Sequence, residues 1–507
     1  VVVLRHGAQR KQAKKQKCAV DGASALQHGG SRIGFYAFND RHCIVAASLC
    51  GLPASLIRAG IFEPSLRGAQ RRSNLPNPLR LLRCAANNGF VGGRVKRLIW
   101  LVLLFGSTAL GQGSGGINAP EHRDKPYLIL ISLDGFRWDY QDLYDTPALD
   151  RIAANGVRAE RMIPVFPTLT FPNHYSIATG LYPANHRLIG NTFPNEDQTD
   201  WYAINRREAV QDGLWYSGEP VWVAAEKAGM VTAAYYFVGT EADIQNVPMT
   251  YWHQFDASVP GLDRVTKALE WLSMPEAERP HFITLYFEDV DTMTHGYGPG
   301  SERSINAIRN VDAYLEVLLD GIDDLPIANN IYLVVVSDHG QLAKKLDDEI
   351  LVIDEVVNTD GLNIVDHGAA AFIYFLQDDA ERAISIRDAI NNQWSHGKAI
   401  LRDEAPAEWR VTEEAGFAEI IVQAEPGYLV YSTESKVQRR SRGDHGWTPE
   451  TEGMHAIFLA SGPRLPKGET IGPIRSVDVY PLMMEILGLP ITTPIDSEAQ
   501  KLVPLLK

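Results

Sequence analysis

Apolar runs alternate with amphipathic segments along most of the chain from residue 127 onward. The first run, Tyr127–Ser132, is apolar at nearly every position, which is typical of a parallel strand covered on both faces. Further strands are predicted at Val231–Phe237, His281–Phe287, Ile331–Ser337, Ala370–Leu376 and Ala456–Ala460. Helical patterns separate most of these runs, at Thr146–Asn155, Pro220–Ala228, Val265–Trp271, Ile305–Leu319, Ile384–Asn392 and Val477–Leu487. The alternation predicts an α/β fold in which helices flank a doubly wound, mostly parallel sheet.

Charge and cysteine divide the chain near residue 97. Residues 1–97 hold 17 Lys+Arg and 3 Asp+Glu, so the totals of 48 and 62 leave 31 basic and 59 acidic residues for the remainder. All four cysteines also lie in the first part, which excludes a disulfide scaffold for the rest. We expect a linker at 112–125 and one catalytic domain at 126–507, with an insertion in the least regular stretch, 345–440.

An export signal is predicted at residues 94–111. Arg94, Lys96 and Arg97 form a positive region, Leu98–Phe105 is apolar, and Ala109 to Gly111 provide small residues for cleavage. A membrane-spanning helix is the alternative, but the apolar run is shorter than the ~20 residues that a bilayer requires. We therefore expect a periplasmic or secreted protein without a membrane anchor after cleavage.

Residues 1–93 lack clear periodicity and precede the predicted signal. We expect them to be a non-native upstream segment or a disordered one. The alternative is a basic arm that binds nucleic acid or anionic membrane, but its charges are scattered and the signal lies downstream of it. No stable nucleic-acid partner is expected.

Candidate metal ligands follow several of the predicted strands. Asp134 follows the first strand, Asp338 and His339 follow Ile331–Ser337, and Asp291 and His295 follow His281–Phe287, while His445 lies near the end of the chain. Each residue alone has an ordinary explanation, such as a turn or a helix cap. Together they form the mixed oxygen and nitrogen set that zinc accepts, at the sheet edge where α/β proteins bind ligands.

Thr170 is predicted to begin a helix that ends near Gly180. Pro172 suits the first turn, and a helix N-terminus favours phosphate because its amides are free. Thr170 is either an N-cap only or a hydroxyl nucleophile activated by a metal.

These motifs resemble the nucleotide pyrophosphatase/phosphodiesterase family of the alkaline-phosphatase superfamily, of bacterial type. The resemblance covers about residues 125–490, with the motifs in the family's order. It is carried by Leu133-Asp134-Gly135-Phe136-Arg137, Thr170-Phe171-Pro172-Asn173-His174-Tyr175, Thr179-Gly180-Leu181-Tyr182-Pro183, Gly218-Glu219-Pro220, Asp291…His295, Ser337-Asp338-His339-Gly340 and Gly443-Asp444-His445-Gly446.

The resemblance implies two Zn²⁺ ions, with Thr170 at the metal centre. One ion would be held by Asp291, His295 and His445, and the other by Asp134, Asp338 and His339. The resemblance also implies that Asn191 contacts a phosphate oxygen and that Phe171 and Tyr286 flank the base of a nucleotide. It further implies a phosphothreonine intermediate on Thr170 in the hydrolysis of nucleotide phosphodiester or pyrophosphate bonds.

The chain departs from the family pattern at the substrate rim. Phe237-Val238-Gly239-Thr240 stands where the family has Trp-Pro-Gly-Ser, and Phe255 stands where another aromatic residue is usual. These departures bear on the identity of the substrate more than on the chemistry. His367, in a second Asp-His-Gly string that precedes a strand, is not expected to bind metal, and neither are His174 and Asp444.

Three alternatives remain open at this point. A phosphodiesterase of the same family that acts on choline phospholipids would share the core motifs, and a substrate panel would distinguish it. A phosphomonoesterase or a sulfatase could use the same fold, although a sulfatase needs a Cys or Ser for formylglycine, and no Cys follows the predicted signal. A binding protein without activity is disfavoured because the nucleophile and every ligand are present.

Overall fold

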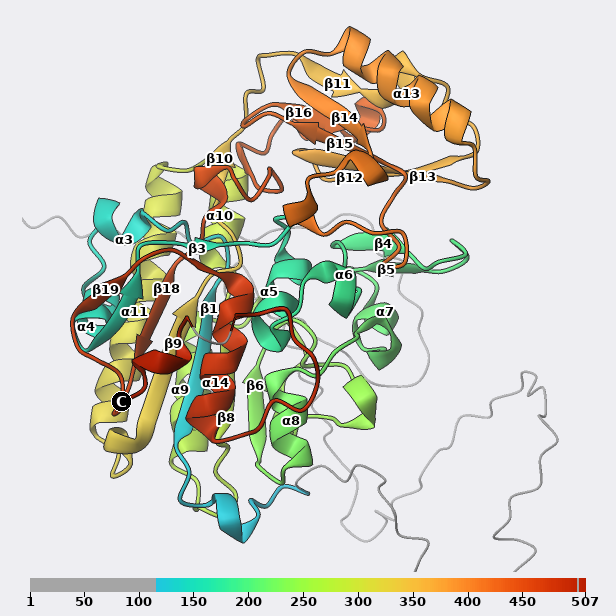
Figure 1. Cartoon of the computed structure of the whole chain (residues 1–507). Coiled ribbons are helices and arrows are strands. Elements are labelled where there is room, and N and C mark those ends of the chain that lie inside the picture. The colour runs from blue at the N-terminus through green and yellow to red at the C-terminus, as the bar shows by residue number, and fades with distance from the viewer. Residues whose placement is uncertain (1–114, 499–500) are drawn as a thin grey trace, which may run out of the picture. The chain divides into compact units, whose positions relative to one another are not determined.

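An eight-stranded, mostly parallel sheet forms the centre of the fold (Figure 1). A computed structural model describes residues 115–498 and 501–507; the predictions for 1–93 and 94–111 concern residues outside the described ones. Across the sheet the strands are β19 (Glu469–Ile471), β2 (Gly156–Ala159), β18 (Phe458–Ser461), β9 (Ile331–Val336), β1 (Tyr127–Leu133), β8 (Phe282–Phe287), β6 (Thr232–Tyr235) and β7 (Tyr251–Trp252). In this sheet β18 runs antiparallel to β9 and β2, and the remaining neighbours pair in parallel.

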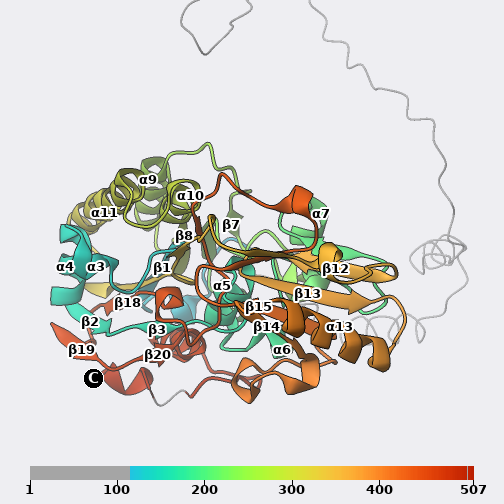
Figure 2. The ribbon, with the colours of Figure 1, turned by 90° about the horizontal axis from the view of Figure 1, so that it is seen from above.

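Helices cover both faces of the sheet, and the side chains of β1 alternate between the two cores. Leu128 and Leu130 belong to the core shared with α5 (Thr170–Thr179), α8 (Val221–Lys227) and α14 (Val479–Leu487). Ile129 and Ile131 belong to the core on the other face, shared with α4 (Pro147–Ala154), α9 (Gly261–Leu272) and α11 (Glu302–Asp323). Figure 2 shows α9 and α11 on one side of the sheet and α5 on the other. The predicted parallel sheet flanked by helices is confirmed.

A second, antiparallel sheet lies between β9 and β18 in the chain. It contains β12 (Leu362–Asp366), β13 (Ala370–Phe375), β15 (Ile420–Ala424) and β14 (Gly397–Leu401), and α13 (Ala380–Gln393) packs on it. The run Ala370–Leu376 was expected in the doubly wound sheet, and that expectation is wrong. Because Phe372 contributes to the core near α5 and Ile373 to the core under α13, both faces of β13 are buried and the run resembles a parallel strand.

Other predicted elements occur with shifted ends. The helix predicted to begin at Ile305 begins at Glu302 because the Ser301 side chain accepts a hydrogen bond from Ser304 N and so caps it. In the segment expected to be a linker, 112–125, Asn118 is buried and its side chain donates to the carbonyls of Glu276 and Arg279. In the part of the chain that the structure describes, none of the helices is both long and apolar enough to cross a bilayer.

Candidate active site

Three neighbouring parallel strands, β9, β1 and β8, bring the candidate ligands to one edge of the sheet. Asp338 and His339 follow β9 after one intervening residue, and Asp134 directly follows β1. Asp291 and His295 lie on α10 (Asp289–Tyr297), which begins two residues after β8 ends. The order β9–β1–β8 therefore places residues from three distant parts of the chain side by side.

Gly135 allows the loops after these strands to approach closely. Its φ of +69° is a left-handed conformation, and an added Cβ would lie 3.0 Å from Asp291 Cα. The Gly135 amide donates to Asp338 Oδ1 at 3.1 Å, and the Asp291 amide donates to the Asp134 carbonyl at 3.1 Å. Close packing of the backbone thus holds the three aspartates together.

The structure brings Asp291, His295 and His445 together, with candidate ligand atoms of all three within 4.8 Å of one another. Asp291 Oδ1 lies 3.4 Å from His295 Nε2 and 4.0 Å from His445 Nε2. Asp291 and His295 are one turn apart on α10, so they point in the same direction, as their spacing suggested. These are the residues expected at one metal ion.

Asp134, Asp338 and His339 also come together. His339 Nε2 lies 2.9 Å from Asp338 Oδ2 and 3.8 Å from Asp134 Oδ1. A separate group of ligand atoms, within 4.8 Å of one another, joins Asp134 and His339 to Asp291. The two sets of predicted ligands are therefore contiguous, and Asp291 connects them.

Backbone carbonyls orient the three candidate histidine ligands in the same way. The Nδ1 atoms of His295, His339 and His445 lie 3.1, 3.1 and 2.9 Å from the carbonyl oxygens of Gly443, Gly340 and Thr168. A carbonyl only accepts, so each Nδ1 carries the proton and each Nε2 keeps its lone pair for a metal.

The carboxylates of Asp134, Asp291 and Asp338 lie close together, so nearby positive charge stabilises their ionised forms. Burial raises the pKa of Asp134 well above its ordinary value, and the carboxylates of Asp338 and Asp291 raise it further. Burial also acts to raise the pKa of Asp338, but the neighbouring His339 and other nearby groups outweigh it and hold that pKa at about 2. A cation between the three carboxylates would therefore favour the ionised form of Asp134.

The histidines respond to the same environment in opposite directions. Burial lowers the pKa of His445 to about 3, and His339 and His295 add to this effect. Burial also acts to lower the pKa of His295, but the Asp291 carboxylate outweighs it and raises the pKa to about 9. His445 is thus held neutral, as a metal ligand must be, whereas Asp291 favours a proton on His295 that a metal ion bound by both residues would replace.

The donor set fits zinc. Asp134 Oδ1 and Asp338 Oδ2 are buried side-chain atoms without a hydrogen-bond partner among the described residues. Two ligand atoms of a tetrahedral zinc lie about 3.3 Å apart, because each lies ~2.0–2.1 Å from the ion. The closest contact in each set, 3.4 Å between Asp291 Oδ1 and His295 Nε2 and 2.9 Å between Asp338 Oδ2 and His339 Nε2, is near that separation.

His174 lies beside the cluster, but its ring atoms have other partners. Its Nδ1 lies 2.8 Å from the Thr170 carbonyl, and its Nε2 lies 2.8 Å from Ser132 Oγ. The carbonyl requires a proton on Nδ1, so Nε2 accepts from the Ser132 hydroxyl. His174 therefore supports the backbone of Thr170 and has no free lone pair for a metal, although it lies near Asp134 and Asp338.

Asp444 and His367 are placed outside the two sets. Asp444 Oδ2 pairs with the buried Lys344 Nζ at 2.9 Å, and its Oδ1 accepts from the His445 amide at 3.1 Å. Among the described residues, His367 joins no cluster of candidate ligands.

Thr170 is the first residue of α5, not its N-cap, which is Leu169. Its hydroxyl caps nothing and lies 3.3 Å from His339 Nε2, at the edge of the second set of ligands. The neighbouring Phe171 amide donates to Asn191 Oδ1 at 3.0 Å. Because that contact fixes the oxygen of the Asn191 amide, its NH₂ group remains available to donate to an anion.

Three aromatic side chains were expected near the substrate, and two of them adjoin each other. The rings of Tyr286 and Phe255 lie 6.0 Å apart. Phe171 directly follows Thr170 in the chain, and the centre of its ring lies 6.0 Å from that of Tyr202. These half-buried rings form an apolar rim for the candidate site.

Two contacts of the site were not foreseen from the sequence. The Tyr286 hydroxyl donates to Asp134 Oδ2 at 2.6 Å, so Tyr286 also orients a candidate ligand. The buried Gln341 side chain donates to both the carboxylate and the carbonyl of Asp291. Its position directly after Ser337-Asp338-His339-Gly340 was the only signal in the sequence that it might reach the site.

Replacing Tyr286 with phenylalanine is expected to weaken metal binding while keeping the ring. Asp134 Oδ2 would lose the one donor that the described residues give it. The loss of such a supporting hydrogen bond typically costs about 10- to 100-fold in metal affinity. Zinc affinity measured by chelator competition tests this expectation, with Phe255→Leu as the control because Phe255 contacts no ligand directly. Unchanged zinc affinity in Tyr286→Phe would show that the hydroxyl does not support Asp134.

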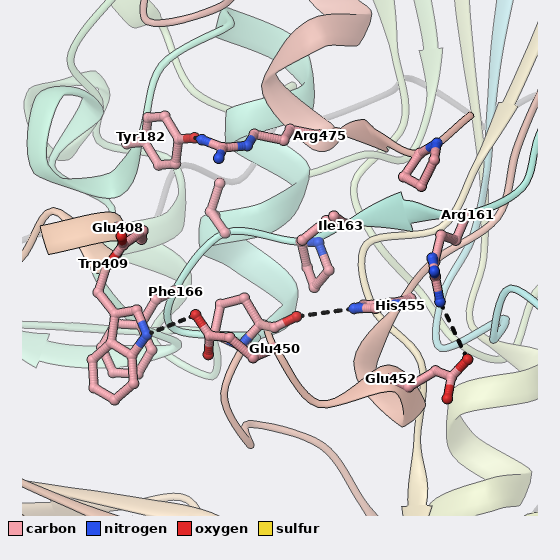
Figure 3. Close-up of a pocket in the computed structure, with 14 residues that line it drawn as sticks. Arg161, Ile163, Phe166, Tyr182, Glu408, Trp409, Glu450, Glu452, His455 and Arg475 are labelled. Carbon is pink, nitrogen blue, oxygen red and sulfur yellow. Dashed lines mark hydrogen bonds and ion pairs between the residues drawn. The ribbon is translucent and has the colours of Figure 1, made fainter. Parts of the chain in front are cut away.

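A separate pocket of about 550 Å³ lies away from these residues (Figure 3). Arg161 and Arg475 line it, and none of the predicted metal or catalytic residues does. Arg161 pairs with Glu452 at 3.2 Å, Arg475 donates to the Tyr182 hydroxyl at 2.7 Å, and the Trp409 indole donates to Glu450 at 3.3 Å. These contacts occupy both arginines and Trp409, and the metal-ligand cluster remains the candidate active site.

Comparison with known proteins identifies relatives over most of the chain. Residues 128–448 match the family model described as type I phosphodiesterase / nucleotide pyrophosphatase. The ectonucleotide pyrophosphatase/phosphodiesterase family member 1 of Rattus norvegicus is 30% identical over 402 residues, covering 77% of this chain and 44% of that protein. A venom phosphodiesterase of Naja atra is 31% identical over 389 residues, covering 74% of this chain and 46% of that protein. The chain spans less than half the length of these curated relatives.

Solved structures agree with the sequence comparisons. Murine ectonucleotide pyrophosphatase/phosphodiesterase 5, in an inactive variant with one threonine replaced by alanine and in complex with AMP, aligns with a TM-score of 0.70 and 27% identity. The alignment covers 76% of this chain and 100% of that structure. The alkaline-phosphatase-like fold and the resemblance seen in the motifs are confirmed, whereas a bacterial type remains a prediction. The chain belongs to the type I phosphodiesterase / nucleotide pyrophosphatase family.

Proposed function

We propose that the protein is a two-zinc hydrolase that cleaves nucleotide phosphodiester or pyrophosphate bonds with Thr170 as nucleophile. The observation that carries the proposal is the position of the Thr170 hydroxyl. It lies at the N-terminus of α5 and 3.3 Å from His339 Nε2, which itself lies near two buried carboxylate oxygens that have no hydrogen-bond partner in the described part of the chain. A hydroxyl in this place is available for attack on a phosphoryl group.

The proposed ligands divide as the motifs suggested. Asp291, His295 and His445 would hold one zinc, and Asp134, Asp338 and His339 would hold the other, with Thr170 between them. When bound, the two ions would supply positive charge to the attacking hydroxyl and to the phosphoryl and leaving-group oxygens.

The chain's own residues perform the remaining steps. A bond forms between Thr170 Oγ1 and phosphorus as the bond from phosphorus to the leaving oxygen breaks, which gives a phosphothreonine. This phosphothreonine still carries the nucleoside ester. Water then forms a bond to phosphorus as the bond from phosphorus to Thr170 Oγ1 breaks, which releases the nucleoside monophosphate and returns a proton to the threonine hydroxyl. The Asn191 amide nitrogen donates to a non-bridging oxygen, and its orientation is supported by the Phe171 amide. Phe171, Tyr286 and Phe255 provide apolar surface for a base.

The relatives support this choice of substrate and nucleophile. The murine relative was solved with AMP, and the variant that replaced one of its threonines with alanine is inactive. We extend both features to this chain: a nucleotide or another small phosphodiester as the substrate and a threonine as the reacting group. We also propose export through the signal at 94–111, to the periplasm or the medium, without a membrane anchor.

Diesters and pyrophosphates are expected to react faster than phosphate monoesters. A monoester carries additional negative charge, and the cationic side chains of the metal-bearing loops have partners elsewhere: Arg137 pairs with Asp139 at 2.6 Å and Lys344 with Asp444 at 2.9 Å. The neutral Asn191 offers less to an extra anionic oxygen than a cation would. We expect kcat/KM for the p-nitrophenyl ester of thymidine 5′-monophosphate to exceed that for p-nitrophenyl phosphate by about 100-fold or more.

The test measures kcat/KM for both substrates in the same zinc buffer, with lysophosphatidylcholine as a third substrate. A monoester rate equal to the diester rate would place the protein among phosphomonoesterases. A higher kcat/KM for the choline lipid would assign it to phospholipid substrates instead.

A further inference from the structure

Phe255 lies on an irregular loop, yet its ring is held in one place. The loop connects β7 to α9, and the Phe255 ring packs against Tyr236 at 5.0 Å and against Tyr286 at 6.0 Å. Tyr286 in turn donates to Asp134 at 2.6 Å. The ring of Tyr286 therefore lies between Phe255 and a candidate metal ligand. A loop residue needs specific restraints to keep such a position.

An ion pair provides the restraints on the backbone of Phe255. The Phe255 amide donates to Glu241 Oε1 at 2.9 Å, and the Phe255 carbonyl accepts from Arg207 Nη2 at 3.3 Å. Arg207 Nη1 also donates to Glu241 Oε2, so the two side chains that hold Phe255 hold each other. Gln211 adds a hydrogen bond to Glu241 Oε2 at 3.2 Å. Both polar backbone groups of one rim residue are thereby bound by a single pair.

The burial of Glu241 fits this role. Its side chain is 7% exposed, whereas that of Arg207 is 40% exposed. A carboxylate this buried needs its hydrogen bonds, and three of its donors come from α7 (Arg207–Val210), from the residue that follows it, and from the loop of Phe255. The pair thus connects three segments at the rim of the site.

We infer that Glu241 and Arg207 are positioning residues that set specificity for the base of the substrate by fixing Phe255. This inference rests on the proposed function, because it assumes a nucleotide bound beside Thr170. Glu241 follows Phe237-Val238-Gly239-Thr240, where the chain departs from the family's usual sequence. Glu241 thus connects the loop of Phe255 to the segment that directly follows this departure.

The test compares two p-nitrophenyl phosphodiesters that differ only in the base: the ester of a nucleoside 5′-monophosphate and the ester of ribose 5-phosphate. For Glu241→Ala and Arg207→Met we expect KM for the nucleoside ester to rise about tenfold, the scale of one lost base–aromatic stack, with kcat nearly unchanged. The kcat/KM for the base-free ester should stay within about twofold, because the metal ligands and Thr170 are not contacted.

Arg206→Met is the matched control. Arg206 precedes Arg207 and pairs instead with Asp200 at 2.8 Å and Glu208 at 3.1 Å, so both esters should react as in the wild type. Phe255→Ala should reproduce the KM change, and combining it with Glu241→Ala should add little, because both changes remove the same base contact.

Any other outcome would contradict either the inference or the proposed function. Equal losses for both esters, or an unchanged KM for the nucleoside ester, would make the pair structural only and overturn the inference. Additive losses in the combined variant would show that Glu241 does not act through Phe255. A wild-type protein that cleaves neither ester would contradict the proposed function itself. If Glu241→Ala fails to fold, the kinetics of Arg207→Met alone test the inference. The Arg207 side chain is exposed, so its replacement opens no cavity.

Discussion

Replacing Thr170 with alanine is expected to lower kcat by about 10³-fold or more while leaving the metal content and nucleotide binding nearly unchanged. The hydroxyl caps no backbone group, and its one described contact is the 3.3 Å approach to His339 Nε2, so its removal disturbs little of the fold. The same removal leaves no nucleophile for a covalent pathway. Steady-state kinetics, zinc content and AMP affinity measured on one preparation separate these effects.

Thr170→Ser is the companion variant, because it retains a hydroxyl and should keep part of the rate. Acid quenching during turnover of a nucleotide diester, followed by peptide mass spectrometry, should detect the nucleotide linked through its phosphate to residue 170 in the wild type and none in Thr170→Ala. Near wild-type hydrolysis by Thr170→Ala would mean that water attacks the substrate directly, and the covalent mechanism would be wrong.

The sheet was predictable because burial on both faces makes its central strands largely apolar. The strand that became β1 is an example: Leu128 and Leu130 face one core, Ile129 and Ile131 face the other, and no polar residue is tolerated between them. The same rule misassigned Ala370–Leu376, because β13 is also covered on both faces, by α13 and by the larger core. Periodicity reports burial and does not tell which sheet a strand joins.

The ligands were predictable for a different reason. Parallel strands place their carboxyl ends at one edge, so an Asp after β1 and an Asp-His pair after β9 must approach each other whatever the loops do. The contacts that depend on side-chain reach were not predictable. Tyr286 was expected only beside a base, yet its hydroxyl reaches Asp134 from the strand next to β1.

Contacts between loop residues that are distant in the chain could not be predicted from the sequence. Glu241 and Phe255 are fourteen residues apart, and no spacing rule connects an irregular turn to the loop after a two-residue strand. His174 could be assigned a local role from its place in the helix, but the partner of its Nε2, Ser132, lies on β1, 42 residues earlier in the chain. The pair of Ser132 and His174 is set by the packing of α5 on the sheet, which the local pattern does not encode.

Replacing His445 with alanine is expected to remove one zinc ion and to lower kcat/KM by about 10²-fold or more. Its Nε2 lies 4.0 Å from Asp291 Oδ1, and its Nδ1 is held 2.9 Å from the Thr168 carbonyl, so the ring is fixed with its lone pair toward the cluster. Without it, Asp291 and His295 provide only two ligands for that ion, and three protein ligands are the usual minimum in catalytic zinc sites.

His367→Ala is the control, because it removes an imidazole from a similar Asp-His-Gly string that joins no group of candidate ligands in the described part of the chain. Elemental analysis should give close to two zinc ions for this variant and close to one for His445→Ala. Thermal unfolding adds a readout that does not depend on turnover: a ligand that binds only the folded state stabilises it, so chelation should lower Tm less in His445→Ala than in the other two proteins. Full zinc in His445→Ala together with depleted zinc in His367→Ala would reverse the assignment and place the metal site at the second string.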